Sequence, residues 1–457
     1  MYGGIFREVL FPLYETRLRG RETLARLREL SRSQWWGEED VREVSFRRMV
    51  EALRFAEQRV PYYRRRFAEH GVRARDVKAP EDLLRFPVLT KADLRAAGKE
   101  LVVDGFRGTL IPSGTGGSTG APVRFSYDHR TYEIRIAAAM RADGWAGARL
   151  GERELHLWGV PLAPEPALQR AKRAAHQALL RKKTVSAFDL SEARLAQLVD
   201  DIARYRPRVI IGFTTALFHV ARYALEVGKR LPPLRGVVTA AERLFSHQRE
   251  TIERAFEAPV FDRYGCREVM LIAAECERHE GKHINAEGVF VELHRNGRLA
   301  RPGEPGEVIV TDLACRSMPL IRYKNEDIAV AAAAPCSCGR GLPMLASVEG
   351  RVLDMIVGPE GQLLAGEFFP HLLKDYPAVR RYQVHQDRQR TITVKVVAGE
   401  GFATETPRLI EHSIRRFLGA QAAIAVQVVD DIPLTPGGKF RVTVSEVPVE
   451  FDLEGTA

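Results

Sequence analysis

One stretch decides how the chain is read, Ile111-Pro112-Ser113-Gly114-Thr115-Gly116-Gly117-Ser118-Thr119-Gly120-Ala121-Pro122-Val123-Arg124-Phe125. The eight residues from Ser113 to Gly120 comprise four glycines and four hydroxyl side chains. Glycine leaves backbone amides accessible, and consecutive amides beside hydroxyl groups form a concave site for an anion. Extended apolar sequence (Val123, Phe125, Tyr127) follows directly, so we predict a polyphosphate-binding loop that leads into a strand. A flexible surface loop is the alternative.

Two better-known phosphate loops do not fit this stretch. The Walker A loop requires Gly-Lys followed by Ser or Thr, whereas Gly120 is followed by Ala121 and Pro122. The Rossmann fingerprint requires Gly-x-Gly-x-x-Gly, and the glycines here have a different spacing. The loop is therefore typical of neither class.

The composition limits the function classes. The chain has 457 residues, of which 45% are hydrophobic and 28% charged, with a formal net charge of +10. These values are ordinary for a globular protein with more than one domain. The basic excess suits a polyanionic partner such as ATP, coenzyme A, nucleic acid or a membrane surface. No RNA-binding aromatic signature accompanies the excess, so we expect no nucleic-acid partner.

The sequence also indicates a compartment. No apolar run reaches the roughly 18 residues of a transmembrane helix, so we expect no membrane span. The segment Met1–Tyr14 contains Arg7 and Glu8 and lacks a cleavage site, which argues against a signal peptide. The number of cysteines, five, is odd in a long chain and argues against a disulfide framework. We expect a cytoplasmic protein.

The pattern of apolar residues changes along the chain. We expect helices through about residues 1–100, with Thr90 capping one of them. Strands and helices alternate over residues 130–260, which predicts parallel sheets with helical crossovers. Short strands follow from residue 284, and Asn296-Gly297 is a hairpin signal.

The fold class expected is therefore α/β. Residues 1–350 should form a large N-terminal domain with mixed and parallel sheets and a helical beginning. A boundary near Gly350-Arg351 should separate it from a small, mobile C-terminal α/β domain over residues 351–457.

The glycine-rich loop resembles the phosphate loop of the adenylate-forming (acyl-CoA synthetase) superfamily. The match covers Gly117-Ser118-Thr119-Gly120-Ala121-Pro122, with Ala121 where lysine is usual. The order of the other motifs, among them Phe86-Pro87 and Thr90-Lys91-x-Asp93-Leu94 before the loop, is similar to the phenylacetate–CoA ligase and CapK-type branch. This resemblance spans most of the chain.

The resemblance implies the nucleotide site. Tyr264 and Gly265 belong to a Tyr-Gly-x-x-Glu motif, in which the tyrosine stacks near adenine and Glu268 helps to hold Mg²⁺. Asp327 is the implied ribose ligand, and Arg351 is implied to contact ribose or phosphate. The implied ATP-binding residues are Ser113, Gly114, Thr115, Gly116, Gly117, Ser118, Thr119, Gly120, Ala241, Glu242, Tyr264, Gly265, Asp327 and Arg351. Taken singly, these motifs are also compatible with a helix N-terminus or strand-end turns.

Two further motifs concern catalysis. Thr435-Pro436-Gly437-Gly438-Lys439 resembles the loop of the catalytic lysine, although alone it would read as a solvated turn. Lys439 and Glu268 are therefore the expected catalytic residues. The hinge motif is represented by Gly350 to Asp354, with Leu353 in place of the usual acid.

Four residues have the character of a structural zinc site. Cys276, His283, Cys336 and Cys338 supply three thiolates and one imidazole, and the branch has the same order of ligands. Reduced, inert cysteines are the alternative.

His279-Glu280-Gly281-Lys282-His283 also matches the zinc-protease string His-Glu-x-x-His. That chemistry requires both histidines on one helix face. We expect a helix over Ala273–Glu280 to stop at Gly281, which disfavours a protease.

The sequence thus predicts an AMP-forming ligase. It should activate a small carboxylic acid, with aryl acids favoured, as an acyl-adenylate using ATP and Mg²⁺, and then transfer the acyl group to coenzyme A. The alternatives are a CapK-like enzyme with another acceptor, a zinc protease, and a basic binding protein without catalysis. A homodimer is left open.

Overall fold

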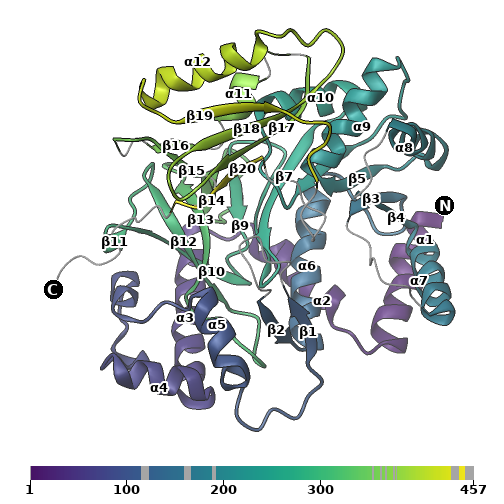
Figure 1. Ribbon diagram of the computed structural model, residues 1–457. Helices are drawn as coiled ribbons and strands as arrows, with labels where there is room; N and C mark the ends of the chain where they lie inside the picture. The colour runs from purple at the N-terminus through teal and green to yellow at the C-terminus, as the bar shows by residue number, and fades with distance from the viewer. Residues whose placement is uncertain are drawn as a thin grey trace.

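The computed structural model describes residues 2–114, 123–158, 166–187, 192–351, 355–360, 363–365, 368–373, 376, 378–433 and 442–447. The chain begins with a helical region, of which α3, α4 and α5 lie at the bottom of Figure 1 and α1 lies at its right edge. Thr90 caps α5 as expected, because its Oγ1 accepts from the Asp93 amide at 3.1 Å and Asp93 Oδ2 accepts from the Thr90 amide at 2.9 Å. The elements of this region are α1 (Tyr2–Ile5), the π-helical η1 (Phe6–Leu10) and η2 (Leu13–Leu18), α2 (Thr23–Ser33), α3 (Glu38–Arg59), α4 (Pro61–Glu69), η3 (Ala74–Asp76), η4 (Pro80–Arg85), α5 (Lys91–Ala97) and η5 (Gly98–Leu101).

The glycine-rich stretch lies between two strands, as predicted. Strand β1 (Ile111–Gly114) pairs antiparallel with β2 (Arg124–Tyr127), with Gly114 opposite Arg124. Phe125 of β2 is buried in the main core. Residues 115–122, which contain most of the loop, lie outside the described residues.

The middle of the chain forms the parallel half of a 12-stranded sheet. Its buried strands are apolar on both faces because helices cover them, which is the usual pattern of parallel sheets. The strands are β3 (Glu154–Trp158), β4 (Lys182–Ser186), β5 (Val209–Phe213), β6 (Gly236–Ala240) and β7 (Val260–Cys266), and the helices are α6 (His129–Trp145), α7 (Ala167–Leu180), α8 (Glu192–Tyr205), α9 (Thr214–Glu226) and α10 (Ser246–Phe256).

The sheet becomes antiparallel at β7, which is parallel to β6 on one side and antiparallel to β8 on the other. The full strand order is β11-β10-β12-β13-β14-β9-β8-β7-β6-β5-β3-β4. Asn296 and Gly297 form the expected tight hairpin, both with positive φ (48° and 71°). The antiparallel strands are β8 (Met270–Glu275), β9 (Lys282–Ile284), β10 (Val289–Arg295), β11 (Arg298–Leu299), β12 (Pro305–Asp312), β13 (Tyr323–Ala331) and β14 (Met344–Arg351).

One expected helix is wrong. Residues Ala273–Glu280 do not form a helix; the chain continues in β8 to Glu275 and then turns into β9. The run Leu271–Ala274 is buried throughout, and a short apolar run of this kind does not distinguish a covered strand from a helix. Pairing with β7 and β9 outweighs the helix preference of the two alanines.

The C-terminal part forms a separate small sheet with the order β19-β18-β17-β20 and lies at the top of Figure 1. It has its own core, in which Val384, Val394 and Val396 meet Ile410 and Ile414 of α12. The mixed α/β architecture with a small C-terminal sheet is therefore confirmed. The elements are β15 (Met355–Val357), β16 (Leu363–Ala365), α11 (Phe368–Leu373), β17 (Val379–Gln386), β18 (Ile392–Ala398), α12 (Thr406–Leu418), β19 (Ile424–Val428) and β20 (Thr443–Ser445).

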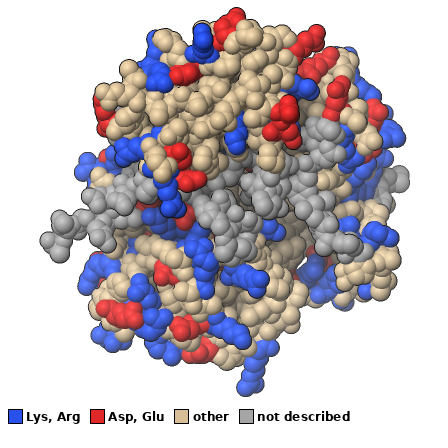
Figure 2. All heavy atoms as spheres, in the orientation of Figure 1, with Lys and Arg blue, Asp and Glu red and all other residues tan. Residues whose placement is uncertain are grey.

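Two further features concern the helices and the charged surface. None of the helices in the described ranges is long and apolar enough to cross a membrane. On the face shown in Figure 2, the described Lys and Arg side chains are mixed with Asp and Glu rather than gathered into one stripe.

A buried arginine joins the helical region to the sheet. Arg322 is 1% exposed, and its Nε and Nη2 donate to Oε1 and Oε2 of Glu292, each at 3.0 Å. Its Nη1 donates to the carbonyl of Phe86, which follows η4. On the backbone, the Leu89 amide donates to the Arg322 carbonyl at 2.9 Å, and the Lys324 amide donates to the Leu89 carbonyl at 3.0 Å. These contacts fix the start of β13.

The charge state of this pair follows from its surroundings. Burial alone would raise the pKa of Glu292, but the Arg322 charge and the hydrogen bonds from His294 and Arg322 outweigh it, and the pKa is lowered. The carboxylate is thus ionised at neutral pH and matches the guanidinium.

We expect Glu292→Gln to lower the free energy of unfolding by about 3–5 kcal/mol, because it leaves a buried guanidinium without its counter-charge. Urea unfolding followed by tryptophan fluorescence measures the change. Glu304→Gln is the matched control, since Glu304 pairs with Arg298 at 2.7 Å on the exposed β10–β11 side of the same sheet. Exposed pairs contribute little, so this variant should unfold like the wild type. Equal effects of the two variants would contradict the role assigned to Arg322.

Candidate active site and metal centre

The expected ribose ligand lies in a buried hydrogen-bond network. Tyr264 at the end of β7 donates its hydroxyl to Asp327 Oδ2 at 2.8 Å. Asn325 Nδ2 donates both to Asp327 Oδ2 and to the Tyr264 hydroxyl oxygen, each at 2.8 Å. Burial and the Asp327 charge raise the pKa of Tyr264 well above its usual value, so the phenol stays protonated and donates. The network holds Asp327 as an oriented carboxylate beside the tyrosine.

A second carboxylate lies nearby on the turn after β7. Glu268 is 3% exposed, and its Oε1 accepts from the Tyr323 hydroxyl at 2.6 Å. This residue sits in the β7–β8 turn, not at a helix N-terminus. Burial and the charges of Glu268 and Asp327 raise the pKa of the Cys266 thiol, so Cys266 is a neutral thiol near both carboxylates. An ionised carboxylate oxygen is the ligand type that Mg²⁺ prefers.

Strand β13 places the polar residues of the site on one face. Tyr323, Asn325 and Asp327 occupy every second position of this part of β13 and are all buried, at a place where a bulge interrupts the ladder to β12. Between them, Glu326 forms an ion pair with Lys91 of α5. The Thr-Lys-x-Asp segment of the helical region is thereby tied to the strand that holds Asp327.

The backbone also places Gly265 and Arg351, two of the expected nucleotide-binding residues, next to Tyr264 and Asp327. Gly265 follows Tyr264, and a Cβ there would lie 1.9 Å from the Met270 carbonyl oxygen, so only glycine fits. Arg351 ends β14 and is the register partner of Asp327. The expected ribose ligand and the expected arginine are therefore cross-strand neighbours.

Ala241 and Glu242 follow the carboxyl end of β6, the edge at which ligands of α/β sheets bind. Ala241 has a positive φ of 69°, which is uncommon for a residue with a Cβ. Glu242 Oε2 accepts from the Thr215 amide at 2.7 Å, at the N-terminus of α9. In this structure the Glu242 carboxylate thus stabilises α9.

The remaining expected nucleotide residues are only partly described. Ser113 and Gly114 end β1. Thr115, Gly116, Gly117, Ser118, Thr119 and Gly120 of the loop, Leu353 and Asp354 of the hinge, and Lys439 all lie outside the described residues.

Sequence reasoning missed Tyr323 and Asn325 as members of the site. Both lie within the four residues before Asp327, but the sequence assigned them no role. The period-two alternation Tyr-x-Asn-x-Asp was the available signal, because it places three polar side chains on one face of a strand.

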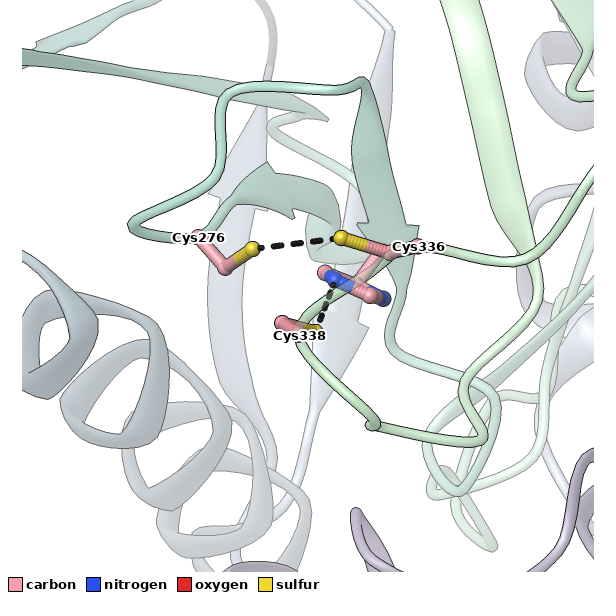
Figure 3. Close-up of side chains that lie close together, drawn as sticks. Cys276, Cys336 and Cys338 are labelled. Carbon is pink, nitrogen blue, oxygen red and sulfur yellow. Dashed lines mark hydrogen bonds between the residues drawn. The ribbon is translucent and has the colours of Figure 1, made fainter.

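The expected metal ligands converge at the joint between the two halves of the sheet. The Sγ atoms of Cys276, Cys336 and Cys338 and a ring nitrogen of His283 all lie within 4.8 Å of one another. Cys276 Sγ is 3.7 Å from Cys336 Sγ, and Cys338 Sγ is 3.4 Å from His283 Nε2 (Figure 3). Here β9 and β14 pair through only Met344–His283 and Leu345–Lys282.

The details of the cluster suit metal ligands. His283 Nδ1 lies 3.4 Å from the Leu342 carbonyl, which leaves Nε2 facing the sulfurs. Burial lowers the pKa of His283 to about 4, so the ring is neutral at pH 7. The amides of Arg278 and Arg340 donate to Cys276 Sγ and Cys338 Sγ at 3.5 and 3.4 Å.

His279 does not join the cluster. Its Nδ1 lies 3.2 Å from Glu275 Oε2, and its φ is 55° in the turn after β8. Glu280 accepts from the Ser337 hydroxyl at 2.6 Å. The two histidines of the protease-like string therefore do not share a helix face, and the structure lacks the geometry of a His-Glu-x-x-His site.

Comparisons with known proteins show which proteins the chain resembles. Residues 356–446 match the CapK C-terminal domain family. The chain is 22% identical over 433 residues to Protein CapK of Staphylococcus aureus, covering 93% of this chain and 92% of CapK. It is 25% identical over 444 residues to the phenylacetate-coenzyme A ligase of Aromatoleum evansii, covering 90% of this chain and 96% of the ligase.

A solved structure has the same fold. 2-Hydroxyisobutyryl-CoA ligase in its postadenylation state, in complex with R3-HIB-AMP, matches with a TM-score of 0.73 at 22% identity, covering 91% of this chain and 92% of the ligase. The similarity therefore extends over both the large sheet and the small C-terminal sheet. Over most of its length the chain is thus similar to the phenylacetate–CoA ligases and to CapK, which form one branch of the adenylate-forming superfamily.

Proposed function

We propose that the protein is an AMP-forming ligase that activates a small carboxylic acid with ATP and passes the acyl group to a thiol, with coenzyme A as the acceptor. The observation that carries the proposal is the pair of buried carboxylates, Asp327 and Glu268, held by Tyr264, Asn325 and Tyr323 beside the β7–β8 turn. A ribose requires an acceptor for its hydroxyls, and a nucleotide–metal complex requires a hard oxygen ligand.

In the first step a carboxylate oxygen of the acid attacks the α-phosphorus of ATP, and pyrophosphate leaves. Asp327 accepts from the ribose hydroxyls, and Arg351 supplies a planar donor on the neighbouring strand. Glu268 is the residue that would hold Mg²⁺, which would offset the charge of the phosphates. Lys439 balances the charge that develops on the α-phosphate.

In the second step the thiol sulfur attacks the acyl carbon, and AMP leaves. The relatives named phenylacetate-coenzyme A ligase favour an aryl acid and coenzyme A. The match of residues 356–446 to the CapK C-terminal domain supports a second candidate, an adenylating enzyme with an acceptor other than coenzyme A. The large part, residues 1–350, would bind ATP and acid, and residues 351–457 would reorient between the two steps.

Cys276, His283, Cys336 and Cys338 would hold one structural Zn²⁺. Three sulfurs and one imidazole nitrogen within 4.8 Å of one another are the ligand set and spacing of a closed tetrahedral site. Four protein ligands leave no open position for a catalytic water, so the ion would stabilise the β9–β14 joint rather than take part in the reaction.

ATP–pyrophosphate exchange with a panel of aryl and aliphatic acids tests the first step. Acid-dependent exchange is the expected result, and no exchange with any acid would contradict the proposal. Coenzyme A-dependent release of AMP then distinguishes the two acceptors.

For the metal, we expect Cys338→Ala to lower both zinc content and Tm, because the binding energy of a structural zinc contributes to folding. His279→Ala should retain the metal. Cys315→Ala controls for the loss of a buried sulfur, since Cys315 lies against Ser317 outside the cluster. Elemental analysis of protein purified without chelators measures the zinc. Metal-free wild type, or zinc loss in His279→Ala, would refute this site.

For the nucleotide, Asp327→Ala should raise the KM for ATP much more than the KM for the acid, because it removes the ribose acceptor. Steady-state kinetics with each substrate varied in turn measure the two values. Asp312→Ala is the comparison for loss of a buried aspartate, since Asp312 pairs with Arg135 at 2.5 Å. An ATP KM that stays at the wild-type value in Asp327→Ala would show that Asp327 is only structural.

For the lysine loop, Lys439→Ala should slow pyrophosphate exchange by about 10³-fold, the scale of losing one donor to a developing charge. Its Tm should not change. Lys395→Ala on β18 of the same small sheet is the matched control and should exchange at the wild-type rate. Normal exchange in the Lys439 variant would remove this residue from the mechanism.

A further inference from the structure

Helix α7 contributes no buried residue to the core of the protein. None of its residues, from Ala167 to Leu180, is buried. Leu168, Ala171 and Ala175 fall on one face at helical spacing, and Leu168 is 67% exposed. An isolated helix of this length is marginal without a packed apolar face. The face of α7 that carries Leu168 is therefore a surface that a partner can cover.

The N-terminal helices carry further exposed apolar residues. Residues Ile5, Val9 and Leu13 recur every four positions in α1, η1 and η2 and are 51%, 56% and 52% exposed, whereas Phe6 and Phe11 face inward. These helices lie beside α7 at the edge of the molecule (Figure 1). Tyr14 and His176 connect them, with 3.3 Å between the Tyr14 hydroxyl and His176 Nδ1. We call this the α7 surface: Ile5, Val9, Leu10, Leu13, Leu18 and Leu168.

Positive charge predominates on and around α7, whereas the N-terminal helices also carry Glu8 and Glu15. Between residues 166 and 187 the chain has no acidic residue, and its cations are Arg170, Lys172, Arg173, Arg181, Lys182 and Lys183. Arg17 in the last turn of η2 and Arg19 directly after it add exposed cations. An apolar helix face flanked by Lys and Arg is the pattern of helices that lie in the interface of an anionic membrane.

A cationic cavity lies at the C-terminal end of α7. It has a volume of about 350 Å³ and is lined by Arg153, Arg181, Lys182, Lys183 and Tyr205. Lys182 and Lys183 begin β4, so the cavity lies at the amino ends of the parallel strands. The nucleotide site lies at the opposite, carboxyl ends, after β6 and β7. The cavity is thus separate from the proposed active site, and two of its cations, Lys182 and Lys183, are paired with Glu154 and Asp201 at 2.9 and 3.2 Å.

Two kinds of partner could cover an apolar surface of this kind, and the charge distinguishes them. In a two-fold dimer the same patch faces itself, so the cations around α7 would oppose the same cations of the second copy. Juxtaposed like charges disfavour that contact. An anionic lipid surface instead offers apolar chains to the leucines and phosphates to the arginines and lysines.

We propose that the α7 surface docks the protein on membranes that contain anionic phospholipid, with Ile5, Val9, Leu13 and Leu168 at the lipid boundary and the cations of α7 on the headgroups. The proposal concerns peripheral contact, which is compatible with the lack of a membrane-crossing helix among the described residues. It goes beyond the ligase reaction and does not depend on it.

Vesicle flotation of the full chain tests the proposal, with phosphatidylcholine vesicles with and without phosphatidylglycerol. We expect binding only with phosphatidylglycerol, and weaker binding as salt is raised. The triple variant Arg170→Gln/Lys172→Gln/Arg173→Gln should bind about 100-fold more weakly, from about 1 kcal/mol per cation near the surface. The triple variant Val9→Gln/Leu13→Gln/Leu168→Gln should bind the vesicles at least about tenfold more weakly than the wild type.

Two control variants remove charged or apolar side chains from other parts of the protein surface. Arg47→Gln/Arg75→Gln/Arg388→Gln removes three exposed cations, and Leu409→Gln/Phe417→Gln removes apolar side chains that are 50% and 60% exposed on α12. Both should float like the wild type. Circular dichroism and acid-dependent pyrophosphate exchange without vesicles show that each variant is folded.

Several results would overturn the proposal. They are failure of the wild type to float, equal flotation with both lipids, wild-type flotation of the α7-surface variants, and equal losses in the control variants. Analytical ultracentrifugation adds another: a dimer that dissociates in the Val9/Leu13/Leu168 variant would assign the surface to a second copy of the chain instead.

Discussion

The buried ion pair of Arg322 and Glu292 is the interaction on which the candidate active site depends. A guanidinium that is almost fully buried is costly unless all its donors are satisfied, and here a bidentate carboxylate and a backbone carbonyl satisfy them. The pair is made between β10 and the residue before β13, while the carbonyl belongs to the N-terminal helical region. Three parts of the chain that are distant in sequence therefore meet at one group. Tyr323, Asn325 and Asp327, which carry the polar groups of the site, follow directly after Arg322 along β13.

The candidate site lies between the parallel and the antiparallel part of the large sheet. Strand β7 is parallel to β6 and antiparallel to β8, so the Tyr264–Glu268 segment lies where the sheet changes character. The glycine at 265 permits the tight turn back into β8, because the Met270 carbonyl occupies the place of a side chain. A carboxylate on that turn and a carboxylate on β13 are then brought close by tyrosines whose hydroxyls stay protonated. The geometry is preorganised by the protein alone.

The sequence was informative where the signal is local. The β1–β2 loop, the alternating strands and helices, the Asn296-Gly297 hairpin and the small C-terminal sheet all follow from periodicity and turn residues. The strand at 270–275 could not be recognised, because a run buried on both faces has no alternation. The role of Arg322 could not be predicted either, because its partners are a glutamate thirty residues away and the backbone carbonyl of Phe86. The order of the ligands in the sequence already favoured His283 over His279 in the cysteine cluster. The turn between the two histidines could not be predicted; in it Gly281 has a φ of 140° and lies against the Leu345 carbonyl.

The short ladder between β9 and β14 has a consequence for how the chain folds. The parallel half with β8 and β9, and the antiparallel strands β10 to β14, each form mainly from neighbouring segments, whereas their joint has two residue pairs between segments about sixty positions apart. Closing such a loop costs chain entropy before the few hydrogen bonds repay it, so non-local pairings of this kind form late. A metal ion bound by Cys276, His283, Cys336 and Cys338 would hold the same two segments, and it would reduce the entropy of the open chain as a disulfide does. The cysteine cluster thus lies at the β9–β14 joint, the part of the sheet that we expect to form last.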